Sequence, residues 1–501
     1  MRKMCYIGLL PLVMAAPAAS EVSSQGETAR PPHTSADGYL KAGQSELNRL
    51  IADKPNQRRA RNVIIFIGDG MGVSTLTASR IFEGQLLGLD GESYVAEMDR
   101  LPHTALVKTY SHDAQVADSA PTATAIVAGV KTKNGLIGVG PEAILDDCAA
   151  SAPYKVESLF GLAEARGYAT GVVTTATITH ATPASTYAHT AQRDWEVDSA
   201  MPEKARNEGC TDIARQMVEW PRGNGLDVML GGGRAHFLPT SAVDPEYPAA
   251  RGKRADGKDL TAIWQSANPG GAYVWNSEGF NAVDPGKTTK LVGLFEPSHM
   301  QYEADRTSGG GKEPSLAEMT LKAIDLLSRN RKGFVLMVEA GRIDHAHHAG
   351  NASRAMYDTV ALNAALKAAL QRVDLSDTLV VVTSDHSHTF TMSGYPERGN
   401  PILGVVANPI GKPTLAKDGK AYTTLGYANG PGSVSAAERP DPAKEDTTAL
   451  NYRQQSLIGL GSETHGGDDV VARAAGPGAY LFKGTIEQNT IFQIMRWALR
   501  I

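Results

Sequence analysis

The stretch NVIIFIGDG at residues 62–70 decides the fold class of this chain. Its first six residues form a continuous apolar run rich in β-branched side chains, which is typical of a central strand in a parallel sheet that is buried on both faces. Similar runs occur at residues 169–174, 227–230, 334–338 and 378–382. We therefore expect each of these runs to be a strand of one parallel sheet.

Helical patterns separate the expected strands, at residues 120–128, 155–166, 315–329 and 353–373. In the last of them, apolar residues recur at three-to-four spacing, and Ser353 is expected to cap its N-terminus. Strands that alternate with helices predict an α/β fold with a doubly wound, mostly parallel central sheet and helices on both faces. Residues 387–464 are rich in Gly, Pro and polar side chains and interrupt the alternation of strands and helices. They are expected to form an inserted subdomain.

The composition limits the kind of ligand that the protein can attract. The 501 residues carry a net charge of -5 and are 42% hydrophobic, which fits an ordinary folded enzyme with a large core. Acidic residues slightly outnumber basic ones, and this charge does not suggest a basic surface for nucleic acid, so no nucleic-acid-binding module is expected. An anionic substrate would have to be attracted by a local cluster of cations, because the global field does not favour it.

The N-terminal residues 1–19 have the pattern of a signal peptide, because Arg2 and Lys3 precede an apolar run that ends in small residues. The alternative is a membrane anchor, but the run is too short to cross a bilayer. Polar residues 20–60 are expected to form an arm on the surface or on a partner subunit. The protein is thus expected to be exported, periplasmic or secreted, with no membrane span.

Removal of the signal peptide leaves two cysteines, Cys148 and Cys210. Two cysteines in an oxidising compartment are expected to pair. The alternative is a pair of buried free thiols, which pack as small apolar side chains.

Acidic residues stand where several of the expected strands end. Asp69 follows the first strand, Glu339 follows the strand at 334–338, and Asp385 follows the strand at 378–382. Each could be a turn or capping residue by itself. The carboxyl ends of parallel strands line one crevice, however, and clustered carboxylates repel one another unless cations neutralise them. The set therefore predicts a metal site.

Histidines near these acids indicate which metal is bound. Asp344 and His348 are four residues apart and can share a helix face, while His386 and the distant His465 add further nitrogen donors. Imidazole with carboxylate suits zinc, whereas an all-oxygen set suits magnesium.

Ser119 stands at the start of the expected helix 120–128. One interpretation is that it caps this helix. The other is that it is a nucleophile, since a helix N-terminus stabilises a phosphoryl group. No Gly-x-Ser-x-Gly motif is present, so activation of the hydroxyl by metal is the remaining route.

Six longer strings show a resemblance to a known family: IIFIGDGMGVSTLTASRI (64–81), DSAPTATAIVAGVK (118–131), THATPASTYAHTAQRDW (179–195), VEAGRIDHAHH (338–348), TSDHSHTF (383–390) and ETHGGDDV (463–470). With these strings the chain resembles alkaline phosphatases, the animal enzymes more than the enteric bacterial form, from about residue 60 to 497. The resemblance implies hydrolysis of phosphate monoesters by a two-zinc mechanism through a phosphoserine intermediate, and a homodimer.

The resemblance also implies a role for each matching position. The implied ligands are Asp344, His348 and His465 for one zinc ion, Asp69, Asp385 and His386 for a second, and Asp69, Thr182 and Glu339 for magnesium. Thr182 stands where the animal enzymes have serine. Ser119 matches the nucleophile, and Arg193 matches the arginine that holds the phosphate oxygens. His180, His345 and His388 are expected to lie beside the ligands without binding an ion.

Further family features follow the same resemblance. A calcium site is implied, with ligands Glu246, Phe295 through its carbonyl, Glu296 and Glu313, the last where the family has aspartate. Cys148 and Cys210 align with a family disulfide. The implied division is a signal peptide (1–19), an N-terminal arm (20–60), a catalytic core (61–386 and 465–501) and a crown-like insertion (387–464) at the dimer interface.

Two other functions compete with this one. A phosphodiesterase or sulfatase of the same superfamily would typically lack the third metal set and the phosphate-binding arginine, so Thr182, Glu339 and Arg193 argue against it. A non-catalytic exported protein that binds phosphate or metal would not need the nucleophile at Ser119.

Overall fold

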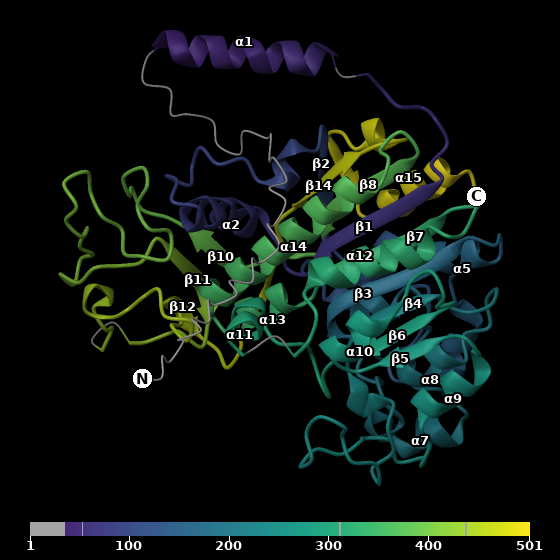
Figure 1. The fold of residues 1–501 in the computed structure, drawn as a ribbon. Helices are drawn as coiled ribbons and strands as arrows, with labels where there is room; N and C mark the ends of the chain where they lie inside the picture. Colours follow the sequence, from purple (N-terminus) through teal and green to yellow (C-terminus); the bar gives the residue numbers. More distant parts are fainter. Residues whose placement is uncertain (1–35, 53, 310–311, 436–437) are drawn as a thin grey trace, which may run out of the picture.

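The computed structural model describes residues 36–52, 54–309, 312–435 and 438–501, and within them a central sheet of ten strands dominates (Figure 1). In spatial order its strands are β15 (Thr485–Glu487), β2 (His103–Lys108), β14 (Val470–Ala475), β8 (Thr378–Ser384), β1 (Asn62–Gly68), β7 (Phe334–Ala340), β3 (Ala169–Thr177), β4 (Val228–Gly232), β6 (Leu291–Leu294) and β5 (Ala272–Val274).

Most neighbours in this sheet run parallel. The pairs from β8 through β1, β7, β3, β4 and β6 to β5 are all parallel, as is β15 with β2, and only β14 runs antiparallel to its two neighbours. Parallel strands need crossover connections, and here helices supply them. The predicted α/β fold with a mostly parallel sheet is confirmed.

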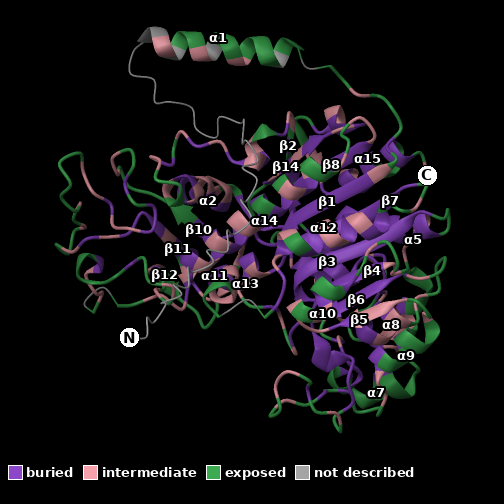
Figure 2. Ribbon diagram, viewed as in Figure 1, coloured by how far each residue is buried: buried purple, intermediate pink, exposed green. Residues whose placement is uncertain are grey.

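Helices cover both faces of the sheet because alternate strand residues point to opposite sides. Val63 and Ile65 of β1 face one core, while Ile64 and Phe66 face the other, and all four are fully buried (Figure 2). The first core contains α3 (Ser119–Ala128), α5 (Leu159–Glu164), α8 (Ile213–Val218), α9 (Leu260–Ala267) and α15 (Thr490–Leu499). The second contains α2 (Val73–Leu86), α10 (Ser277–Ala282), α12 (Leu316–Leu327) and α14 (Ala352–Arg372).

The predicted elements are present with shifted ends. All five expected strands form, and β3, β7 and β8 run two or three residues further than predicted. The helix expected at 155–166 is reduced to α5, which begins at Leu159 behind the capping Ser158. The prediction that Ser353 caps α14 is wrong: the Asn351 side chain accepts the hydrogen bond from the Arg354 N–H, and Ser353 lies inside the helix.

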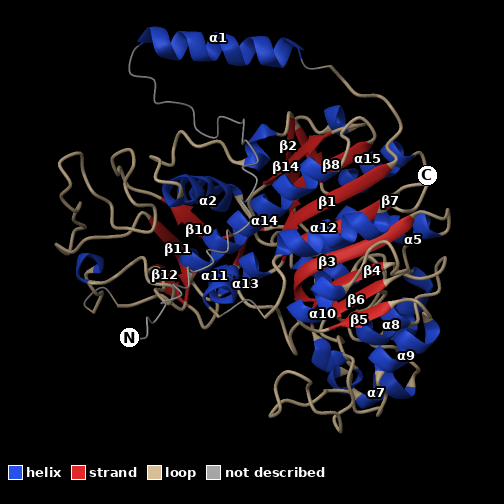
Figure 3. Cartoon of the chain, viewed as in Figure 1, coloured by secondary structure: helices blue, strands red, loops and turns tan. Residues whose placement is uncertain are grey.

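Two smaller sheets follow β8. One has the order β10 (Phe390–Met392), β11 (Leu425–Gly430) and β12 (Ser456–Gly459), and it lies to the left of the main sheet in Figure 3. In the other, β9 (Ser387–His388) pairs antiparallel with β13 (His465–Gly466). This second pair brings the two ends of the expected insertion together. The division of the chain into units stays a prediction.

The N-terminal arm forms α1 (Ala36–Ala52), which stands away from the rest of the chain in Figure 1. The predicted signal peptide lies outside the described residues. The remaining short helices are α4 (Cys148–Ser151), α6 (Ala181–Ala184), α7 (Glu203–Asn207), α11 (Glu303–Ser308) and α13 (Arg342–His348). Within the described ranges, no helix is long and apolar enough to cross a membrane.

Candidate active site

The carboxyl ends of three adjacent strands bring buried acids together. Asp69 follows β1, Glu339 lies near the end of β7, and Asp385 follows β8. All three are fully buried, and the Gly70 N–H donates to Asp385 Oδ1 at 3.0 Å. Gly70 has φ of 67°, and a Cβ there would lie 2.3 Å from His388 Nε2, so this turn requires glycine.

A first group of donor atoms surrounds Asp344 of α13. His348, His388 and His465 direct their Nε2 atoms to Asp344 Oδ1 at 3.3, 2.9 and 3.3 Å. The Nε2 atoms of His348 and His465 are also 3.1 Å apart. One carboxylate and several imidazoles within 4.8 Å form a donor set that suits zinc.

The opposite nitrogens of these rings determine which of them can bind an ion. His348 Nδ1 lies 2.5 Å from the Glu463 carbonyl and His465 Nδ1 lies 2.8 Å from the Ala117 carbonyl. Each Nδ1 therefore donates its proton, and each Nε2 is left with a free lone pair. His388 differs: although burial alone lowers its pKa, hydrogen bonds to Asp344 and Glu463 raise it to about 9. His388 is thus a donor that holds Asp344.

A second group forms around His386. Its Nε2 lies 3.3 Å from Asp69 Oδ1, 3.2 Å from Asp385 Oδ2 and 3.1 Å from Ser119 Oγ. Burial lowers the pKa of His386 well below its usual value, so the ring is neutral and able to bind a metal. Burial, together with the carboxylates of Asp385 and Asp344, raises the pKa of Asp69 well above its usual range. A cation would relieve this repulsion.

A third group contains Asp69, His180 and Glu339, with Thr182 nearby. Asp69 Oδ2, Glu339 Oε1, Thr182 Oγ1 and His180 Nδ1 are buried and find no hydrogen-bond partner among the described residues. Burial raises the pKa of Glu339 to about 7, even though the Thr174 hydroxyl donates a hydrogen bond to it. Buried polar atoms without partners are costly, so the three oxygen atoms of this group fit a bound cation.

Ser119 is the first residue of α3 and is 98% shielded from solvent, with a relative exposure of 2%. Asp118, not Ser119, caps this helix, because its side chain accepts the Ala120 N–H at 2.7 Å. The interpretation of Ser119 as a cap is therefore wrong. Its hydroxyl is instead directed at His386 and Asp69, at 3.1 and 3.5 Å.

Arg193 lies beside the same crevice. Its Nη1 donates to Asp118 Oδ1 at 3.3 Å and its Nη2 donates to His180 Nε2 at 3.2 Å. The carboxylates of Asp118 and Asp69 raise the pKa of Arg193 in spite of its burial, so it stays charged. A guanidinium held on one side by Asp118 can offer its remaining N–H groups to an anion.

His180 and His345, expected beside the ligands, belong to a cluster of three rings with His299. Their ring centroids lie 5.6, 5.4 and 4.2 Å apart. His299, which the sequence did not single out, accepts the Thr177 N–H on Nδ1 at 3.0 Å. Burial and nearby Arg342 lower the pKa of His299 to about 4, and burial lowers the pKa of His180 and of His345 well below the usual value, so the cluster is neutral.

The four residues of the expected calcium site lie near one another but on loops. Glu296 Oε1 accepts the Tyr247 hydroxyl at 2.8 Å, Glu246 Oε2 pairs with Arg234 at 3.4 Å, and Glu313 Oε1 accepts the Gln301 N–H at 2.8 Å. Glu313 Oε2 is buried without a partner. Burial, with Glu296 and Glu246 adding repulsion, raises the pKa of Glu313 to about 8. Phe295, whose carbonyl is the remaining expected ligand, is buried and directly follows β6.

Sequence reasoning missed two acids that support the site. Glu463 accepts from His388 Nδ1 at 2.5 Å and from Thr389 at 2.6 Å, and Asp118 holds both α3 and Arg193. Asp118 carries a local signal, because aspartate is a common N-cap and stands immediately before the first residue of α3. No local pattern marks Glu463.

Comparison with known proteins decides the family. The family model described as alkaline phosphatase matches residues 60–501. The chain belongs to the alkaline phosphatase family. It is 45% identical over 450 residues to the tissue-nonspecific alkaline phosphatase of Gallus gallus, covering 88% of this chain and 85% of that protein, and 44% identical over 457 residues to that of Homo sapiens, covering 90% and 85%.

Solved structures agree with this assignment to alkaline phosphatases. The Thermus thermophilus alkaline phosphatase is 26% identical with a TM-score of 0.64, covering 90% of this chain and 93% of that one. The enzyme of the Antarctic bacterium TAB5 is 25% identical with a TM-score of 0.59, covering 89% and 99%. The chain is therefore a phosphomonoester hydrolase of a metal-dependent family that acts on small phosphate substrates, and the donor groups around Asp344 and Asp69 are its candidate metal sites.

Proposed function

We propose that this alkaline phosphatase hydrolyses phosphate monoesters through a phosphoserine at Ser119, with two zinc ions and one magnesium ion. Asp344, His348 and His465 would hold one zinc ion, and Asp69, Asp385 and His386 the other. Asp69, Thr182 and Glu339 would hold magnesium. When bound, the zinc ions supply Lewis-acid stabilisation of the serine oxygen and of the leaving oxygen.

The protein residues perform the remaining tasks. Helix α3 presents Ser119 Oγ within 3.1 Å of His386 Nε2, which fixes the direction of attack. Ser119 Oγ gives up its proton to solvent and bonds to phosphorus as the bond between phosphorus and the ester oxygen breaks, and the departing alcohol takes a proton from water. A water molecule then gives up a proton and bonds to phosphorus as the bond to Ser119 Oγ breaks. Ser119 Oγ regains a proton, and inorganic phosphate is released. Arg193 binds oxygens of the phosphoryl group equally before and during both steps.

The observation that carries this proposal is the place of Ser119. Its hydroxyl contacts His386 and Asp69, both members of a donor group, while Asp118 performs the capping of α3. A serine that does not cap its helix, is buried at the helix N-terminus and lies beside metal donors is well suited to nucleophilic attack.

The test is Ser119→Ala, assayed on para-nitrophenyl phosphate and its bis-ester at pH 9. Loss of the nucleophile should lower turnover on the monoester by about three orders of magnitude or more, since triad nucleophiles contribute on this scale. Zinc content, measured by mass spectrometry, should stay normal. Lost zinc would show that Ser119 serves the metal site instead. Preference of the unmodified enzyme for the bis-ester would favour a phosphodiesterase, and no turnover of either ester would favour a binding protein.

Further features of the family extend the proposal. Glu246, Phe295, Glu296 and Glu313 would hold calcium, supported by the partnerless Glu313 Oε2. The region of the small three-stranded sheet exposes large apolar side chains, including Tyr395 at 95%, Leu457 at 83% and Ile410 at 75%, which supports a homodimer formed through this crown-like insertion. The disulfide supports export to the periplasm or the medium.

A further inference from the structure

Arg193 lies in the segment of residues 189–195, called the Arg193 segment below. The loop at residues 134–147 holds this segment on one side. The Arg193 N–H donates to the Gly135 carbonyl at 2.8 Å, and the Asp146 N–H donates to the Ala191 carbonyl at 3.0 Å. Gly135 in turn donates its N–H to Asp118 Oδ2 at 2.7 Å. The backbone of this loop therefore sets where Arg193 stands relative to its own ion-pair partner.

On the other side, the same segment is held by the start of α8. The Ile213 N–H donates to the Trp195 carbonyl at 2.9 Å, and Gln216 Oε1 accepts the His189 N–H at 2.9 Å. The Arg193 segment thus lies between two supports that are far apart in sequence.

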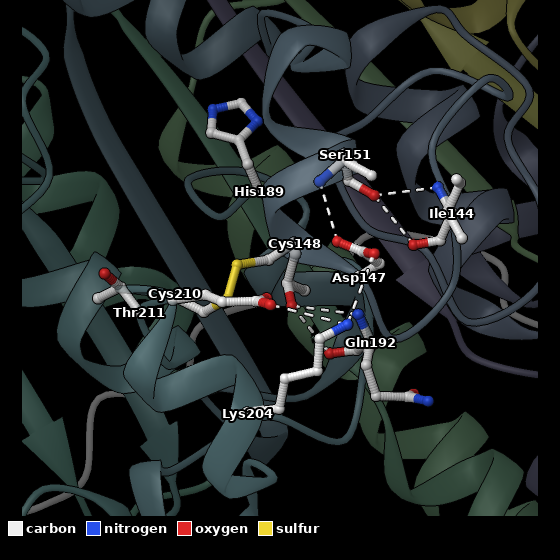
Figure 4. Close-up of a disulfide and its surroundings, with 12 residues drawn as sticks. Ile144, Asp147, Cys148, Ser151, His189, Gln192, Lys204, Cys210 and Thr211 are labelled. Atoms are coloured by element: carbon white, nitrogen blue, oxygen red, sulfur yellow. Dashed lines mark hydrogen bonds and ion pairs between the residues drawn. A yellow bond between two sulfur atoms is a disulfide. The ribbon is translucent and has the colours of Figure 1, made fainter.

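The Cys148–Cys210 disulfide joins these two supports (Figure 4). Cys148 directly follows the 134–147 loop, and Cys210 stands three residues before Ile213, with a Cα–Cα distance of 6.1 Å. Ser151 of α4 ties the loop further, because its Oγ accepts the Ile144 N–H at 3.0 Å and donates to the Ile144 carbonyl at 2.9 Å (Figure 4).

The packing around the disulfide is separate from the two main cores. Leu136, Ala191, Trp195 and a few neighbours form a small apolar cluster against the two cysteines. A cavity of about 460 Å³ adjoins it, lined among others by both cysteines, Ala191 and Trp195. Both cysteines line this cavity and are partly exposed, so small thiol reagents can reach the disulfide.

We propose that Cys148, Cys210 and Trp195 are positioning residues for Arg193, so that the disulfide tightens phosphate binding. This inference rests on the proposed role of Arg193 as the phosphate-binding arginine. Loss of the disulfide would let the two supports move apart and shift the guanidinium away from the phosphate, whereas the metal donors around Asp344 lie on other elements and would keep their places. The expected signature is weaker phosphate binding with little change in chemistry.

The experiment compares the full-length enzyme with the C148S/C210S double variant and with Trp195→Phe. Inhibition by inorganic phosphate and the KM for para-nitrophenyl phosphate should both weaken about 10-fold in the double variant, and less in Trp195→Phe, because displacements of about 1 Å have effects of this size or larger. Turnover at saturating substrate should change less than about twofold, and bis-ester hydrolysis should change little. Reduction of the wild-type enzyme, followed by reoxidation, should reproduce and then reverse the shift.

Two controls separate a positioning role from general destabilisation and from failure of the proposed function. Leu366→Ala opens a cavity in α14, on the other core, and should lower Tm without changing inhibition by phosphate. Arg193→Ala should weaken phosphate inhibition by more than the cysteine variant does. If Arg193→Ala leaves inhibition unchanged, the role of Arg193 is wrong. If Arg193→Ala weakens it but the cysteine and tryptophan variants do not, only the positioning inference is overturned.

Discussion

Two clusters of acids in this molecule face the same electrostatic problem and solve it differently. In the crevice around Asp69 and Asp344, donor atoms from several elements converge within 4.8 Å of one another, and imidazoles stand among the carboxylates. In the cluster of Glu246, Glu296 and Glu313, one oxygen of each carboxylate accepts a hydrogen bond from the protein. Its donor atoms do not converge in the same way.

The difference follows from the elements that carry the acids. Strand ends such as those before Asp69 and Asp385 are fixed by a continuous parallel ladder, so their side chains cannot move apart to avoid repulsion. Loop residues such as Glu246 and Glu313 can instead turn towards Arg234 or a backbone N–H. A rigid cluster depends on its cations, whereas a cluster on loops can relax without one. The predictions below test this contrast.

The largest effect is expected for Asp344→Asn. Asp344 belongs to two donor groups and accepts from His388 at 2.9 Å, so its charge holds both proposed zinc positions. Outer-shell changes alone weaken metal binding about 10–100-fold, and loss of this central charge should exceed that range. We expect zinc content to fall and phosphatase activity to be lost at ordinary zinc concentrations, as measured by mass spectrometry and turnover.

Asp358→Asn is the matched control for this variant. Asp358 is a buried acid of α14 whose pKa burial raises to about 8, so the folded protein holds it protonated near neutral pH and asparagine resembles it closely. It should keep its zinc. Normal zinc content in Asp344→Asn would contradict the dependence of the rigid cluster on its cations.

A smaller effect is expected for Glu313→Gln in the cluster on loops. Calcium at about 100 times its Kd should stabilise the wild-type enzyme by about 2.7 kcal/mol, and the variant should lose most of this gain, as measured by Tm with and without calcium. Without calcium the two proteins should melt at similar temperatures, because this cluster relaxes by itself. The exposed Glu278→Gln serves as control. An equal calcium-induced rise in Tm in all three proteins would exclude Glu313 as a ligand.

The sequence was sufficient for the strands and for the residues at their ends, because a run such as 62–67 permits only a strand that is buried on both faces. It was not sufficient for β2 and β14, which are partly exposed and take their place only by pairing with other strands. It also left open whether Ser119 caps α3, since Asp118 and Ser119 are both good capping residues and only the hydrogen bond from the Ala120 N–H distinguishes them.

The protonation states of the histidines at the site could not be predicted from the sequence either. His348 and His388 both lie among the conspicuous histidines, yet one has a free Nε2 and the other is held protonated by Asp344 and Glu463. What separates them is the partner of Nδ1, a backbone carbonyl for His348 and a carboxylate for His388. Such partners come from distant parts of the chain, and no local pattern specifies them.

The smallest effect concerns a buried acid that lies outside both clusters. Glu164 of α5 accepts the Thr170 hydroxyl at 2.7 Å, and burial raises its pKa to about 7. In the unfolded chain it ionises near its ordinary value of about 4.3. As pH rises between these values the unfolded chain releases the proton and the folded protein keeps it, so the free energy of unfolding falls. Glu164→Gln has no ionisable side chain at this position, so its free energy of unfolding should not fall in this way.

We therefore expect Glu164→Gln to melt like the wild-type enzyme at pH 5 and to be more stable at pH 8, by on the order of 1 kcal/mol after allowance for solvent screening. The measurement is Tm at both pH values for the metal-loaded enzyme, with the exposed Glu219→Gln as control. A gap that does not grow with pH would mean that Glu164 ionises in the folded protein as easily as in the unfolded chain. A growing gap would show that a buried acid outside both clusters, with Asp227 and Lys290 acting on it in opposite directions, stays neutral by keeping its proton. In the rigid crevice around Asp69, by contrast, the proposed metal ions would neutralise the acids.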